Sequence, residues 1–223
     1  MVMGEMVMEL KKRNCGIDFQ VSILTQRWQR YSITINGDRH ENMVSAAVSS
    51  MLGDMIDALY EMYPEAHDDS RPKVAKYLCQ DPSWSNKITA ITASISWDNE
   101  GEALWWRLTR QLYEEKKMLD IELESDFEDE DKTYHYRVPF FDMCYAVAKA
   151  ATLVLKQTGV IGYHYLGETD AIDIHHFLYI KHLGILETPI PLFPANFDSN
   201  SQYPSGDKIT SLADEIALLQ FEM

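Results

Sequence analysis

Hydrophobic and polar residues alternate along two runs near the start of the chain. In residues 17–25, apolar side chains occupy every second position from 17 to 23, which predicts a strand with one buried face. Residues 28–35 are rich in aromatic and β-branched types, which favour strands, and they run into Asn36-Gly37, a pair typical of turns. A tight connection at Gln26-Arg27 would join the runs, so we expect a β-hairpin followed by a turn out of its second strand.

Strand patterns return in the middle of the chain. Three runs carry them: residues 88–97, 103–113 and 118–127. The third run alternates most clearly, because Leu119, Ile121 and Leu123 share one parity. Turn-forming residues at 98–101 separate the first two runs. Together the three runs predict an antiparallel meander.

Helical spacing appears before and after this meander. Apolar residues three and four positions apart predict a helix over about 44–62, ended by Pro64. Its methionines are either core filler or an adaptable binding face. The segment 139–159 is apolar around most of its circumference, which predicts a buried central helix that opens at Pro139 and ends at Gly159.

The last third of the chain has less regular patterns. Residues 173–184 are predicted to form a helix ended by Gly184. Four prolines within 187–206 indicate an extended loop. Residues 209–219 have the spacing of a short amphipathic helix, which either folds back onto the body or docks on a partner, including a second copy of the chain.

This order of elements predicts an α+β fold. We expect an antiparallel sheet, made of the N-terminal hairpin plus the three-strand meander, with helices packed mainly on one face. Residues 1–13 are expected to be a partly ordered leader and residues 14–223 a single domain, which a chain of 223 residues can form. A boundary near 65–87, where prolines interrupt the pattern, is the alternative.

Cysteine usage and hydropathy favour a soluble, cytoplasmic protein. Cys15, Cys79 and Cys144 are odd in number and far apart, which is typical of reduced thiols. The apolar residues at the start precede the first basic cluster, the reverse of a secretory signal. No stretch approaches the roughly 18 apolar residues of a membrane-spanning helix.

Charge changes this picture most. The chain has a formal net charge of -15, and two windows hold nearly all of it: residues 114–131 and 54–69. An acidic chain does not displace counterions from phosphate backbones, and it is not attracted to anionic membranes, so we expect neither nucleic acid nor membrane as a partner. It does favour basic protein partners.

One acidic window follows the parity of a predicted strand. Asp120, Glu122 and Glu124 should form a row opposite the apolar side chains of residues 118–127, and the row leads into a predicted loop from Glu128 to Asp131. The row is either a solvated outer face or a contact surface for a basic protein. The second interpretation takes the following residues as the contact: Asp120, Glu122, Glu124, Asp126, Glu128, Asp129, Glu130 and Asp131, with Trp105 or Trp106 as an aromatic anchor.

The catalytic alternative depends on acids and histidines near residue 175. Asp173, His175, His176 and His182 are the candidate ligands of a metal-dependent hydrolase, which needs three protein ligands and a water at zinc. Asp170 belongs to the same cluster, and Glu168 or His164 would have to complete such a site. Glycine-rich phosphate loops, a dinucleotide fingerprint and a serine nucleophile elbow are missing from the sequence, so no cofactor is predicted.

These observations favour a non-enzymatic acidic binding protein of bacterial type. By analogy of charge, it would be an inhibitor or a toxin-immunity factor that covers a basic, phosphate-binding site on its partner. The metal-dependent hydrolase is the competing hypothesis.

Overall fold

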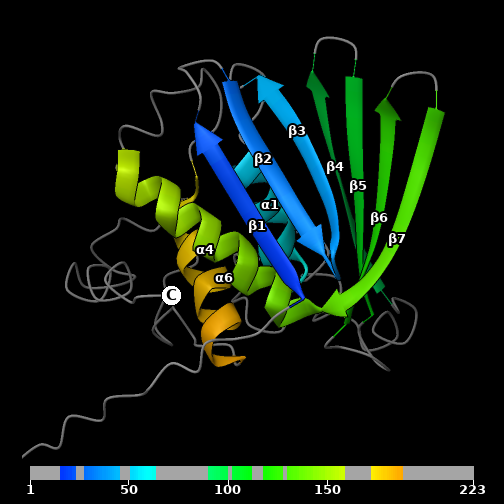
Figure 1. The fold of residues 1–223 in the computed structure, drawn as a ribbon. Helices are drawn as coiled ribbons and strands as arrows, with labels where there is room; N and C mark the ends of the chain where they lie inside the picture. The colour runs from blue at the N-terminus through cyan, green and yellow to red at the C-terminus, as the bar shows by residue number, and fades with distance from the viewer. Residues whose placement is uncertain are drawn as a thin grey trace, which may run out of the picture.

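The structure is a computed structural model, and it describes residues 16–23, 28–45, 51–63, 90–99, 102–111, 118–127, 130–158 and 172–187. These residues form two antiparallel sheets and three helices (Figure 1). The predicted α+β class is therefore confirmed. The predictions for residues 1–13, the boundary near 65–87, the loop at 187–206 and the helix at 209–219 lie outside the described residues.

The first sheet has the order β1-β2-β3, with β1 at Ile17–Ile23, β2 at Trp28–Ile35 and β3 at Asp38–Ser45. The predicted hairpin is β1–β2. Asn36 and Gly37 both have positive φ, 52° and 100°, as a two-residue hairpin turn requires, so the chain turns back into β3. The prediction that a helix begins near residue 44 was wrong, because residues 44 and 45 pair with β2 and helix α1 begins at Met51.

The second sheet has the order β4-β5-β6-β7. Its first three strands are the predicted meander: β4 at Ala90–Asn99, β5 at Glu102–Gln111 and β6 at Met118–Phe127. The fourth, β7 at Glu130–Pro139, was not predicted. Glu130 and Asp131 were expected in a loop, yet they pair with β6, and Pro139 ends β7 instead of opening the next helix. Proline is tolerated there because the strand stops and helix α4 begins at Phe140.

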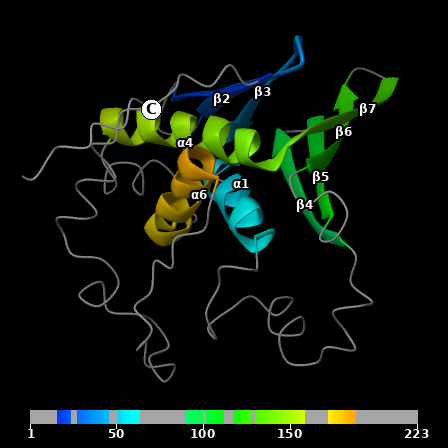
Figure 2. The same ribbon diagram turned by 90° about the horizontal axis from the view of Figure 1, so that it is seen from below.

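Helices α1 (Met51–Glu61), α4 (Phe140–Thr158) and α6 (Ile174–Leu186) pack on one another beside the sheets. Figure 2 shows α4 against the first sheet, with α6 and α1 beyond it and the second sheet to one side. Among these described helices, none is long and apolar enough to cross a membrane.

The prediction that Gly184 ends its helix was wrong. Helix α6 continues to Leu186, and a Cβ atom at Gly184 would lie 2.6 Å from the backbone of Tyr145. The glycine therefore lets α6 approach the backbone of α4 closely.

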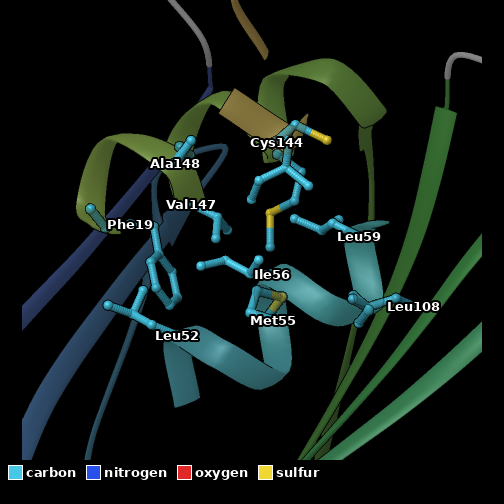
Figure 3. Packing of buried hydrophobic residues seen from close by; sticks show 14 of the residues in the cluster. Phe19, Leu52, Met55, Ile56, Leu59, Leu108, Cys144, Val147 and Ala148 are labelled. Carbon is cyan, nitrogen blue, oxygen red and sulfur yellow. The ribbon is translucent and has the colours of Figure 1, made fainter. Parts of the chain in front are cut away.

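A single hydrophobic core joins the helices to both sheets (Figure 3). The methionines of α1 belong to this core, since Met51 and Met55 are fully buried. This result favours core filling over a methionine-rich binding face. Cys144 of α4 is buried in the same core.

The core contains one arginine, Arg110 of β5. Its Nη1 donates a hydrogen bond of 2.5 Å to the carbonyl oxygen of Met62, just after α1. Its guanidinium lies 4.4 Å from the ring centre of Tyr63 and 4.8 Å from that of Phe140. This arginine thereby connects the end of α1 to the second sheet. The hydrogen bond and the two aromatic rings offset the cost of desolvating its guanidinium.

Candidate functional site

The outer face of the second sheet carries the predicted acidic row. Strand register aligns its side chains into three rows that cross all four strands. The Trp105 row contains Ser96, Trp105, Glu124 and Thr133. The Arg107 row contains Ser94, Arg107, Glu122 and His135. The Thr109 row contains Thr92, Thr109, Asp120 and Arg137.

The parity prediction for β6 is confirmed. Leu119, Ile121 and Leu123 are buried in the core, whereas the acids that alternate with them are half-buried, as at Glu122, or exposed, as at Glu124. Apolar side chains at every second position of a strand must lie on one face, so the acids face the other.

The acidic row is less uniform than the sequence suggested, because basic residues of the neighbouring strands lie beside two of its members. Arg107 Nη1 lies 2.9 Å from Glu122 Oε1, and His135 Nδ1 lies 3.7 Å from Glu122 Oε2. Arg137 Nε lies 3.6 Å from Asp120 Oδ1. In the Arg107 and Thr109 rows, the carboxylate therefore has an arginine of the same row beside it.

The Trp105 row differs from the other two. Trp105 is 41% exposed, although most large hydrophobic side chains of the described residues are buried. Its cross-strand neighbour Glu124 is exposed and forms no ion pair with any residue that the structure describes. An open indole ring and an open carboxylate therefore stand side by side.

Trp106, the other predicted anchor, is not on this face. It is only 1% exposed and belongs to the core, because it follows Trp105 by one position and strand parity turns it inward. The prediction that Trp106 could reach a partner was wrong.

Acidic residues follow the Trp105 row in the strand register. The next register positions on the four strands are Asp98, Ala103, Asp126 and Asp131, three of which are acidic. The β4–β5 and β6–β7 hairpins turn at this end, since Asn99 pairs with Glu102 and Phe127 pairs with Glu130. Glu128 and Asp129, also predicted as contacts, lie outside the described residues. We call this end of the sheet the acidic end.

Two hollows lie on the outer face, on either side of the ion pair between Arg107 and Glu122. The first, about 270 Å³, is lined by Ser94, Ile95, Ser96, Trp105, Trp106, Arg107, Glu122 and Glu124. The second, about 340 Å³, is lined by Arg107, Thr109, Asp120, Ile121, Glu122, His135, Tyr136 and Arg137. The face is thus a hollowed polar surface rather than a flat sheet.

A second polar cluster joins α1 to α6. His176 Nδ1 lies 2.7 Å from Asp57 Oδ1, and the ring of Tyr60 stacks on the imidazole with centroids 3.7 Å apart. Asp173 caps α6 by accepting a hydrogen bond of 3.1 Å from the His176 backbone N–H. Burial, together with Asp173 and Asp57, raises the pKa of Tyr60 to about 12, and burial chiefly raises the pKa of Glu61.

This cluster contains only part of the predicted metal site. Asp173 and His176 are neighbours, but His182 is buried elsewhere on α6, where burial lowers its pKa to about 4. The side chain of His175 and the whole of Asp170 lie outside what the structure describes. Within the described ranges, no three His, Cys, Asp or Glu side chains are grouped so that they could hold a metal ion.

Sequence reasoning missed two polar contacts between residues that are far apart along the chain. Asp57 meets His176 across 119 positions of the chain, so no local pattern could join them. The same holds for His40 of β3, whose Nε2 lies 2.6 Å from Tyr136 Oη of β7. Burial lowers the pKa of His40, and burial with the nearby Asp38 raises the pKa of Tyr136 to about 12, so this contact links the two sheets as a neutral pair.

Comparison of the chain with protein-family models, with curated proteins and with solved structures finds no match. Within the described residues, the outer face of the second sheet combines the exposed indole of Trp105, the carboxylate of Glu124, which has no ion pair there, and the ion pairs of Arg107 and Arg137.

Proposed function

We propose that this protein is a non-enzymatic binding protein that recognises a basic protein through the outer face of its second sheet. The contact is centred on the Trp105 row and extends toward the acidic end. The observation that carries the proposal is the exposed Trp105 beside Glu124, a carboxylate with no ion pair in the described part of the chain.

Each part of the face has a distinct role in this proposal. Acids gathered at one end attract a basic partner over long range and raise the association rate in a salt-dependent way. An exposed tryptophan supplies apolar contact area, and tryptophan is enriched among the residues that dominate interface energetics. The paired charges of the Arg107 and Thr109 rows form a polar rim that needs no partner to be satisfied.

The partner class follows from the charge. A protein surface that is strongly basic is often one that binds phosphate groups, and an acidic protein can cover such a surface. We propose inhibition by steric and electrostatic occlusion, as a cytoplasmic inhibitor or a toxin-immunity factor of bacterial type would perform it.

The test is capture of partners by the full chain at low and high salt, with the retained proteins identified by mass spectrometry. Glu124→Lys and Trp105→Ala alter the proposed contact. Glu41→Lys on β3 and Leu153→Ala on α4 are matched controls, because Glu41 is an exposed acid of the other sheet and Leu153 is 52% exposed.

A basic protein that is retained at low salt, released at high salt, lost by both contact variants and kept by both controls is the expected result. Retention that ignores the contact variants, or a retained partner that is acidic, would overturn the proposal.

A further inference from the structure

We propose that the hollow beside Trp105 receives the guanidinium group of an arginine side chain from the partner. This inference rests on the proposed function and deepens it, because it names the chemical group that the contact recognises. It concerns the hollow of about 270 Å³ lined by Ser94, Ser96, Trp105, Arg107, Glu122 and Glu124.

The size of the hollow suits one side-chain head group. Pockets for drug-sized ligands measure roughly 300–1,000 Å³. A hollow of about 270 Å³ that is open to solvent on the sheet face is smaller than these, so it fits part of a larger partner better than a separate small molecule.

The charge of the lining selects a cation. Glu122 and Glu124 contribute two negative charges and Arg107 one positive charge, and Arg107 pairs with Glu122, whereas Glu124 has no ion pair with a described residue. An anion would meet both carboxylates, whereas a cation is attracted to Glu124. Arg107 repels a second cation from the middle of the sheet, which directs it toward Trp105.

The arrangement of Trp105 and Glu124 favours guanidinium over ammonium. The two residues are direct cross-strand partners, and such partners have Cβ atoms roughly 4.5–5.5 Å apart. A planar guanidinium can lie on the indole face while its edge N–H groups donate to the adjacent carboxylate. A lysine ammonium is a compact, strongly hydrated charge that cannot stack in this way.

Two peptides of equal charge separate this inference from simple electrostatic attraction. The probes are an arginine–glycine and a lysine–glycine octapeptide with four cations each, titrated calorimetrically into the full chain at low salt. We expect the arginine peptide to bind about two- to fivefold more tightly, because planar stacking on the indole and paired N–H donation to the carboxylate add to the charge attraction that both peptides share. Trp105→Leu should abolish this preference, Trp105→Phe should retain part of it, and Leu153→Ala should leave it unchanged.

The outcomes distinguish the two proposals. Equal binding of both peptides by the wild-type chain would overturn the guanidinium site and leave a basic partner in place. No binding of either peptide would contradict both proposals. A preference for arginine that persists in Trp105→Leu, with the fold confirmed by circular dichroism, would place the discrimination elsewhere and overturn the inference.

Discussion

The two faces of the second sheet place neighbouring residues of one strand in opposite environments. On β5, Trp106 and Arg110 point into the core, whereas Trp105 and Arg107 point outward. Inside, the charged Arg110 has a backbone acceptor and two aromatic rings around it. Outside, Arg107 pairs with Glu122 while Glu124 stays open. A buried polar group must therefore form its hydrogen bonds within the fold. A polar group on the outer face can bind water instead and stays accessible to a partner.

The largest expected effect separates the two adjacent tryptophans. Trp106→Ala should destabilise the fold by about 3–5 kcal/mol, because it empties a fully buried site in the core. Trp105→Ala should change stability by no more than about 0.5 kcal/mol, since its side chain lies on the surface. Denaturant unfolding of both variants measures this contrast, and equal losses would mean that the two faces are not distinct.

The next effect concerns a buried histidine. Burial lowers the pKa of His182 to about 4, so the folded state binds its proton less readily than the unfolded chain, whose histidine pKa is near 6.5. The contribution to stability is therefore fully present above pH 6.5 and is lost as the pH falls toward 4, a loss of about 3 kcal/mol.

Unfolding measured between pH 7 and pH 4 tests this expectation. His182→Met should flatten the decline. Leu153→Ala, a substitution of an exposed, non-titrating side chain on α4, is the control and should keep the wild-type profile. A decline that survives in His182→Met would assign the acid sensitivity to other groups.

A smaller effect is expected at the buried arginine. Arg110→Met preserves much of the volume but leaves the carbonyl oxygen of Met62 without this donor, at a cost of about 2 kcal/mol. Arg107→Met, on the same strand but the outer face, is the control and should be nearly neutral. Chemical denaturation compares the two variants, and a neutral Arg110→Met would show that the internal arginine is dispensable.

The smallest effect is the ion pair of the outer face. A double-mutant cycle on Arg107 and Glu122 should give a coupling of about 0.2–1 kcal/mol, as is usual for exposed pairs, and high salt should reduce it. A coupling well above this range would mean that the outer rows stabilise the fold as the inner face does.

Local patterns were enough to predict much of the fold. The alternation in β6 placed its leucines inward, and the apolar run that forms α4 was recognised almost to its ends. Two strands were missed for different reasons. The Asn36-Gly37 turn indicates a hairpin that continues into β3. The helical spacing of apolar residues begins at the end of this strand, so the sequence pattern favours a helix there instead. Strand β7 was obscured by the acids at its start.

The candidate site was only half predictable. Strand parity alone identified Asp120, Glu122 and Glu124 as one outer row. It could not show that Arg107 and Arg137 neutralise two of them, because these partners stand on neighbouring strands whose register is set by pairing and by the turns between them.

Local periodicity and composition in the sequence are enough to assign the inward and outward side chains of β6 and to locate the negative charge in two windows. Only the packing of the elements shows that Glu124, which forms no ion pair with a described residue, lies beside Trp105 and that Asp57 contacts His176. Contacts of this kind join residues far apart along the chain, and they exist only once the sheets and helices have packed and fixed which strands and faces are neighbours.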